Sequence, residues 1–171
     1  MRTRQSYRFG YRWQIRGPID TVFHYVSDAR TFHEWFDVFK EVRADDPTGP
    51  VHVGSHTHCT VKALLPYVLD WDITVSQLEP PNFLQTEVHL TLNGRFQMNG
   101  YVRYRLEQEG PIVTVINEQE LIPERPLPWC LSPLAQAAFT FNHHWAMGRA
   151  QERLQHVVSQ RAANSADHPG P

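Results

Sequence analysis

Apolar and polar side chains alternate along several segments of the chain, and this two-residue period is typical of half-buried strands. In the first segment, Tyr7–Arg16, aromatic and aliphatic side chains hold the odd positions and arginines recur at the even ones. The later segments are Phe39–Ala44, Val51–Leu64, Tyr67–Leu78, Phe83–Leu92, Arg95–Glu107 and Ile112–Ile122. The pattern therefore predicts about seven strands. It leaves open which face of Val51–Leu64 and of Ile112–Ile122 turns inward.

Helical spacing replaces the alternation in three places. Two short helices are expected after the first strand, one beginning near Asp20 and one over Ala29–Trp35. A long helix is predicted from Pro133 to Arg161, where Ser132 offers a capping hydroxyl and proline suits the first helical position. Its apolar stripe recurs every three or four residues and consists of Phe139, His143, Ala146, Met147, Ala150, Leu154 and Val157.

The order of these elements predicts an α+β fold. Turns of hairpin length join the strands, with Asn93-Gly94 as the strongest signal, so the sheet should be antiparallel. Strands and helices are segregated along the chain rather than alternating. A single helix closing a curved sheet leaves a concavity between them. We expect one domain over residues 1–161 and a disordered tail over 162–171, where the sequence is small, polar and proline-containing.

Composition narrows the function classes. The chain has 171 residues, which suits one domain with a sizeable core, and a formal net charge of -2, which argues against nucleic acid as a partner. No apolar run of signal-peptide or membrane-span length is present, so a cytoplasmic protein is expected. The two cysteines, Cys59 and Cys130, lack CxxC spacing and should be reduced thiols. A homodimer is one assembly that the sequence leaves open.

Several motifs resemble those of one known superfamily. They are Gly17-Pro18-Ile19-Asp20-Thr21-Val22-Phe23 leading to Trp35, Leu65-Pro66-Tyr67 leading to Trp71, Leu78-Glu79-Pro80-Pro81, and Asn142-His143-His144-Trp145-Ala146-Met147. Their order resembles the helix-grip fold of the START-like, birch-pollen-allergen-like superfamily, also called SRPBCC, in its polyketide cyclase/dehydrase and lipid transport branch. The chain departs from that pattern at Ala150-Gln151, where the family often carries a Gly-Glu pair.

The resemblance implies a curved sheet of about seven antiparallel strands wrapped around the long C-terminal helix, with two short helices after the first strand. It also implies three functions to weigh. The first is binding of a hydrophobic or aromatic small molecule, lipid or polyketide-like, between sheet and helix. The second is a polyketide cyclase/dehydratase acting on a ligand in the same cavity. The third is a protein-interaction or co-chaperone module, which needs an exposed apolar patch instead of a cavity. Whether the protein is an enzyme is left open.

Aromatic residues and a few polar ones on predicted inward faces form the candidate ligand site, because apolar pockets with sparse polar groups are typical of small-molecule sites. The candidates are Trp35, Thr57, Tyr67, Trp71, Phe96, Tyr104, Asn117, Phe139, Asn142, His143 and Met147. His143 is the best catalytic candidate. Burial should lower its pKa, and we expect Tyr104 or Asn117 as its hydrogen-bond partner, although a hydrogen-bonded core histidine is the simpler interpretation.

Two further pairs have plausible chemistry and a simpler alternative. His56 and His58 share a strand face and would form a metal pair if Glu87 and His89 joined them, but a solvent-facing polar row explains them as well. Glu118 and Glu120 could do acid–base work only inside a cleft, and an exposed row is the simpler interpretation. We expect no metal and no cofactor.

Overall fold

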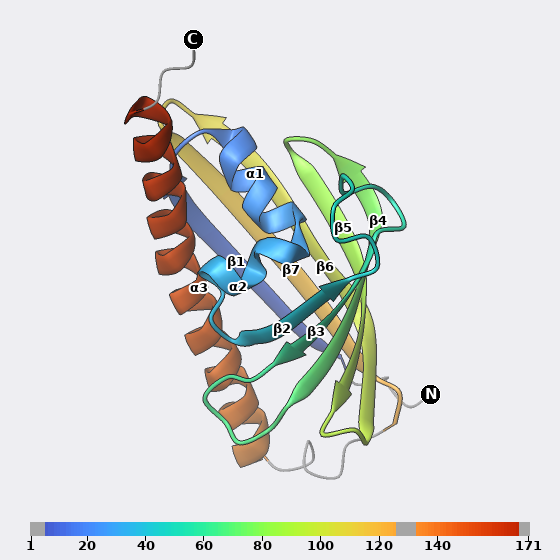
Figure 1. The fold of residues 1–171 in the computed structure, drawn as a ribbon. Helices are drawn as coiled ribbons and strands as arrows, with labels where there is room; N and C mark the ends of the chain where they lie inside the picture. The colour runs from blue at the N-terminus through green and yellow to red at the C-terminus, as the bar shows by residue number, and fades with distance from the viewer. Residues whose placement is uncertain (1–5, 126–132, 168–171) are drawn as a thin grey trace.

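The computed structural model describes residues 6–125 and 133–167. Its main element is a strongly curved seven-stranded antiparallel sheet (Figure 1). The strands lie in the order β1-β7-β6-β5-β4-β3-β2. The elements are β1 (Tyr7–Arg16), α1 (Ile19–Ser27), the 3-10 turn η1 (Ala29–Thr31), α2 (Phe32–Trp35), β2 (Phe39–Ala44), β3 (His56–Val61), β4 (Leu69–Glu79), β5 (Phe83–Leu92), β6 (Phe96–Glu109), β7 (Ile112–Pro123) and α3 (Pro133–Asp167). The predicted α+β helix-grip arrangement is confirmed.

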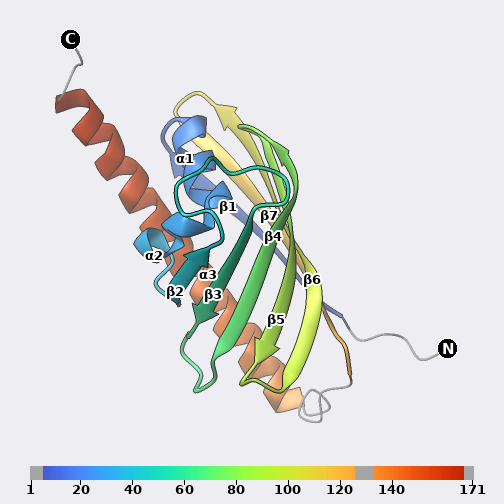
Figure 2. The same cartoon turned by 45° about the vertical axis from the view of Figure 1, so that its right-hand side comes forward.

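The long helix α3 runs along the open side of the curved sheet, and α1 and α2 lie on that same side (Figures 1 and 2). Its buried stripe follows the predicted spacing through Ala146, Met147, Ala150 and Leu154. At the next turn Val158 is buried instead of the predicted Val157. The helix also continues to Asp167, so residues 162–167, which we expected in a disordered tail, are helical. Ser132 and Cys130 lie outside the described residues.

The alternating segments fold as their pattern predicts. In β1, Trp13 and Ile15 are 2% and 0% exposed, while the arginines on the opposite face are exposed. The β5–β6 hairpin turns at Asn93 and Gly94, whose φ angles of 48° and 67° are the positive pair that a type I′ turn requires. Strand β5 spans the predicted residues without a shift.

One strand prediction is wrong in extent. Only His56–Val61 of the predicted Val51–Leu64 strand is extended, because the segment before it forms a loop. There the side chain of Asp46 accepts hydrogen bonds from the amides of Thr48 and Gly49, at 3.2 and 2.8 Å, and fixes a local turn. The structure also decides the two open faces. Thr57, Cys59 and Val61 turn inward in β3, and Val113, Val115, Asn117, Gln119 and Leu121 do so in β7.

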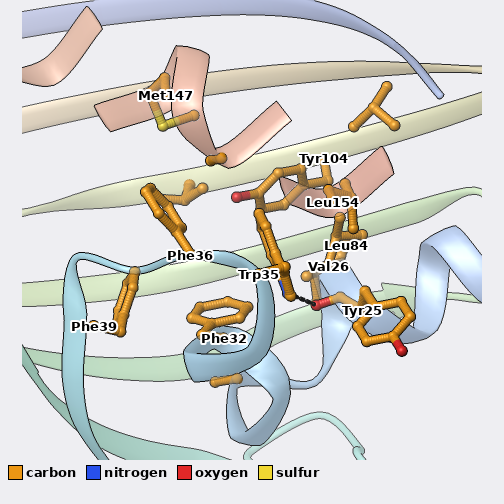
Figure 3. Packing of buried hydrophobic residues seen from close by; sticks show 14 of the residues in the cluster. Tyr25, Val26, Phe32, Trp35, Phe36, Phe39, Leu84, Tyr104, Met147 and Leu154 are labelled. Atoms are coloured by element: carbon orange, nitrogen blue, oxygen red, sulfur yellow. Dashed lines mark hydrogen bonds between the residues drawn. The ribbon is translucent and has the colours of Figure 1, made fainter. Parts of the chain in front are cut away.

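An aromatic cluster fills one part of the space between α1, α2 and the sheet (Figure 3). Trp35 is 0% exposed and packs edge-on against Trp13 and Phe32, with ring centroids 6.3 and 5.5 Å away. Phe36 stacks on Trp35 at 5.4 Å. Within residues 6–125 and 133–167, no helix is both long enough and apolar enough to cross a membrane.

Candidate functional site

A cavity of about 320 Å³ lies between the concave face of the sheet and α3. Strands β3 to β7 supply one wall, and the first half of α3, with η1 and α2, supplies the other. The wall is mostly aliphatic and aromatic, since Val, Leu, Ile, Phe, Trp and Met side chains supply most of its strand residues. Apolar cavities of this size with a few polar groups are the usual form of small-molecule sites.

The cavity reaches the surface beside the loop that joins β2 to β3. Asp46, Pro50 and His52 in this loop line the cavity and are themselves exposed. Arg30 in η1 closes the rim from the other side. Its guanidinium binds both carboxylate oxygens of Asp28 at 2.8 Å and donates to the carbonyl of Asp46 at 3.3 Å. The opening is therefore a polar rim over an apolar interior.

Most of the side chains predicted to bind a ligand lie in this wall, and three do not. Those in the wall are Thr57, Tyr67, Trp71, Tyr104, Phe139, Asn142, His143 and Met147. Trp35 is enclosed in the aromatic cluster, where its indole nitrogen donates to the carbonyl of Tyr25 at 3.2 Å. Asn117 is 0% exposed and lies behind Gln119. Phe96 begins β6 and is half-buried outside the wall. Ligand binding by the wall residues stays a prediction.

His143 makes hydrogen bonds through both ring nitrogens. Its Nε2 lies 3.0 Å from Oε1 of Gln119, and its Nδ1 lies 2.6 Å from the hydroxyl of Tyr11. Because the amide oxygen can only accept, Nε2 carries the proton and Nδ1 accepts from Tyr11. The expected partners, Tyr104 and Asn117, are wrong: Tyr104 is not bonded to the ring, and Asn117 is reached only through Gln119, at 2.7 Å.

Burial lowers the pKa of His143 to about 3, with a smaller contribution from the neighbouring His144. The predicted direction is confirmed. The ring also stacks on Phe9, with centroids 3.9 Å apart and planes inclined by 12°. Desolvation disfavours the charged imidazolium, so the ring is neutral at ordinary pH. A group with so low a pKa is a poor proton acceptor near neutrality.

Asn142 ties α3 to the connection between β3 and β4. Its Oδ1 accepts from the amides of Leu64 and Leu65, at 3.0 and 3.2 Å, and its Nδ2 donates to the hydroxyl of Tyr67 at 2.6 Å. These bonds explain why an amide is buried at the cavity's edge, since they satisfy two backbone donors in a segment outside the sheet. The side chain thus holds the wall together.

Two other polar groups in the wall have no such partners. The indole Nε1 of Trp71 is the one side-chain nitrogen or oxygen in the described part of the chain that has almost no accessible surface and no hydrogen-bond partner. The phenol of Tyr104 forms no hydrogen bond to any described residue, and burial raises its pKa. Figure 3 shows the Tyr104 hydroxyl directed away from Leu154, toward the side on which Phe36 and Met147 lie.

Sequence reasoning missed Gln119, which lines the cavity and orients His143. Its position on the same β7 face as Asn117 was the available signal, but the direction of that face was undecided. It also missed Arg30 and Asp28 at the rim, because only the fold brings η1 beside the β2–β3 loop.

The remaining polar pairs lie on strand faces opposite the buried residues, and His56 at the start of β3 also borders the cavity at its rim. His56 and His58 both contact Asp72, at 3.4 and 2.9 Å, and His56 also contacts Asp45 at 3.1 Å. No group of three or more His, Cys, Asp or Glu side chains within the described ranges is arranged to hold a metal ion. Glu118 pairs with Arg103 at 3.4 Å, and Glu120 with Arg8 at 2.9 Å. Both glutamates therefore face away from the cavity.

Comparisons with known proteins agree with this architecture. No family model matches the sequence, and no curated protein does. Among solved structures, the ZhuI aromatase/cyclase from Streptomyces sp. R1128 is similar, with a TM-score of 0.71, 10% identity, and 92% of this chain and 96% of that chain covered. A conserved protein from Geobacillus kaustophilus has a TM-score of 0.70, 10% identity, and 91% and 96% covered.

A START superfamily protein from Mycobacterium smegmatis is also similar, with a TM-score of 0.58, 14% identity, and 85% of this chain and 97% of that chain covered. Identities this low establish the architecture and not the activity. The structural match extends over nearly the whole length of each of these proteins. The chain has a helix-grip fold, similar to that of these proteins.

Proposed function

We propose that this protein binds a hydrophobic or aromatic small molecule, lipid or polyketide-like, in the cavity between the sheet and α3. The observation that carries the proposal is the cavity itself, about 320 Å³ of space with a mostly apolar wall and a polar rim. An apolar ligand of that size would gain roughly 25 cal/mol for each Å² of apolar surface removed from water. The similar fold of an aromatase/cyclase supports a ring-containing or polyketide-like ligand.

A cyclase or dehydratase acting in the same cavity is the second candidate, and His143 is the observation that favours it. A histidine with a strongly lowered pKa in a cavity wall is a common mark of catalysis. Its ring nitrogens, however, are both held by Gln119 and Tyr11. The carboxylate of Asp28 is likewise held by Arg30. Binding is therefore better supported than acid–base chemistry.

An interaction module is supported least, because it would use an exposed apolar surface and have no need of an enclosed cavity. The cytoplasmic location and the homodimer stay predictions from the sequence.

Filling the cavity tests the proposal. Ala146 is 8% exposed and lies in the wall on α3, whereas Ala137 on the same helix is exposed and outside the wall. We expect Ala146→Phe to weaken binding of the neutral fluorescent probe N-phenyl-1-naphthylamine at least tenfold, and Ala137→Phe to leave it unchanged. Thermal melts confirm that both variants fold. Native mass spectrometry of freshly purified protein would identify a co-purifying ligand. Equal probe binding by folded Ala146→Phe and wild type would contradict the proposal.

A further inference from the structure

The indole N–H of Trp71 lacks an acceptor although it is enclosed by protein. Its nitrogen has almost no solvent-accessible surface, and no described residue accepts from it. An indole nitrogen is only a donor, so it cannot be satisfied by a neighbouring N–H. Native proteins avoid leaving a buried donor unpaired in the great majority of cases, because the unmade hydrogen bond costs free energy. Such a group needs an explanation in terms of what occupies the space beside it.

The register of the sheet places Trp71 well inside the cavity. Its neighbours across the sheet are Cys59 on β3 and Leu90 on β5, both buried. The ring stacks on Phe39 with centroids 5.5 Å apart, so one face is covered. His56, at the end of β3 nearest the rim, pairs with Thr74. Trp71 is three residues farther along β4, or about 10 Å deeper at roughly 3.3 Å per residue.

A second donor lies near the same end of the cavity. The hydroxyl oxygen of Tyr67 accepts from Asn142 at 2.6 Å, which leaves the hydroxyl proton free to donate. Tyr67 also lines the cavity, and burial raises its pKa, so the phenol keeps its proton. By contrast, the oxygen of Asn142 already accepts two backbone amides. At this end of the cavity, which lies away from the rim and is called the deep end below, more hydrogen-bond donors than acceptors therefore lack a partner.

Among its described residues the wall offers an anionic partner no unpaired lysine or arginine. Arg30 is the one lysine or arginine among the described residues of the wall, and it is committed to Asp28. Asp45 and Asp46 add negative charge at the rim. An ionised carboxylate would enter this apolar space without a counter-charge, at a high desolvation cost. A neutral oxygen acceptor meets the donors without that cost.

We infer that the cavity is selective for neutral ring-containing carbonyl compounds, whose carbonyl oxygen points to the deep end and accepts a hydrogen bond from Trp71 Nε1. This bond requires the indole to turn, because its N–H has almost no accessible surface in the structure. The hydroxyl of Tyr67 is positioned to serve as an additional donor on that side. This inference rests on the proposed function, because it names the ligand class of the same cavity.

Two neutral compounds of nearly the same shape test it, 2-acetylnaphthalene, which carries the carbonyl, and 2-isopropylnaphthalene, which does not. Their affinities are measured by displacement of N-phenyl-1-naphthylamine from wild type and from Trp71→Phe. Phenylalanine keeps an aromatic ring and removes the N–H. We expect the variant to bind the ketone about tenfold more weakly and the hydrocarbon equally well, as the loss of one hydrogen bond of about 1.4 kcal/mol predicts.

Trp145→Phe is the matched control, since Trp145 lies outside the cavity wall, beside Arg149. It should leave both affinities unchanged. The indole N–H signal that disappears from the NMR spectrum of Trp71→Phe identifies Trp71 in wild type, and it should move downfield with the ketone alone. 2-Naphthoate, the anionic analogue, should bind at least tenfold more weakly than the ketone.

The outcomes separate the inference from the proposed function. If folded wild type binds neither naphthalene, the proposed function is contradicted and the inference falls with it. If both compounds bind and Trp71→Phe weakens them equally or not at all, only the inference is overturned. Tighter binding of naphthoate than of the ketone would also overturn it, since an anion would then be the preferred ligand.

Discussion

Trp35 and Trp71 were both candidates for the ligand site in the sequence, yet the fold gives them opposite surroundings. Trp35 is fully enclosed, has aromatic neighbours on several sides, and donates its N–H to the carbonyl of Tyr25. Trp71 is half-buried in the cavity wall, stacks on one ring, and has no acceptor. The first residue completes the core. Trp71 keeps part of its ring surface uncovered and its N–H unpaired, and a binding site requires such unused groups.

The largest expected effect tests this contrast directly. Trp35→Ala should lower the free energy of unfolding by about 3–5 kcal/mol, because it opens a void among packed rings. Trp71→Ala should cost clearly less, because its side chain already borders open space. Urea denaturation of both variants decides the matter. Equal losses would show that the wall around Trp71 is as closely packed as the core.

Asn142 lies in the wall but resembles Trp35, since its polar atoms are used by the protein. Asn142→Ala leaves two backbone amides and the Tyr67 hydroxyl without their partner. We expect a loss of about 2–3 kcal/mol in the free energy of unfolding, measured by thermal melts. His156→Ala, an exposed change on the same helix, is the control and should stay within about 0.5 kcal/mol. A similarly small change for Asn142→Ala would show that the fold does not depend on the hydrogen bonds of Asn142, so that this residue resembles Trp71 instead.

His143 should also behave as part of the framework. His143→Phe removes the partner of Gln119 and Tyr11 and should cost about 1–2 kcal/mol at pH 7, while probe affinity stays unchanged. A tenfold loss of probe affinity without loss of stability would instead make His143 a ligand-binding group.

The same histidine gives a pH dependence with a definite sign. Burial depresses its pKa from 6.5 to about 3 in the folded state, so only the unfolded chain binds the proton between these values. The contribution of the neutral His143 ring to the free energy of unfolding is therefore complete above pH 6.5. It is lost as the pH falls toward 3, by up to about 1.4 kcal/mol per pH unit. The stability advantage of wild type over His143→Phe should therefore disappear and then reverse in melts from pH 7 to pH 4. A constant difference would contradict a buried neutral ring.

The smallest expected effect concerns Thr57, which resembles Trp71. It is 8% exposed in the cavity wall, and its hydroxyl forms no hydrogen bond to a described residue. Thr57→Val keeps the shape and removes the hydroxyl, so stability should rise by about 0.5 kcal/mol in urea denaturation. A loss of more than about 1 kcal/mol would show that the protein itself uses the hydroxyl.

The sequence predicted what depends on local patterning. Strand β5 and the Asn93-Gly94 turn were found because alternation and positive φ angles leave a direct trace in residue type. The chain from Val51 to Ser55 was misread as strand, since valine alternates with polar residues there. Side-chain bonds of Asp46 and the geometry of Gly54, with φ of 94°, make it a loop over the rim instead.

The site was predictable only as a set of inward-facing residues. His143 was correctly identified as buried, but its partner Tyr11 is 132 residues away in the chain and its partner Gln119 lies on a strand whose inward face was undecided. The unpaired N–H of Trp71 depends on every neighbour of the ring, and no pattern in the chain encodes such an absence.

The pairing of β1 with β7 sets the order in which the protein can form. Tyr7 lies opposite Leu121, and α3 packs beside the same strand, so the residues of β1 find these partners only after β7 and α3 have been synthesised. Closing so long a loop is entropically costly, and folds dominated by distant pairings form in roughly milliseconds to seconds. During translation the strands β2 to β6 can assemble by consecutive hairpins. The apolar side chains of β1 stay exposed to solvent in that period. We therefore expect β1 to be a site of aggregation in the nascent chain until β7 has been made.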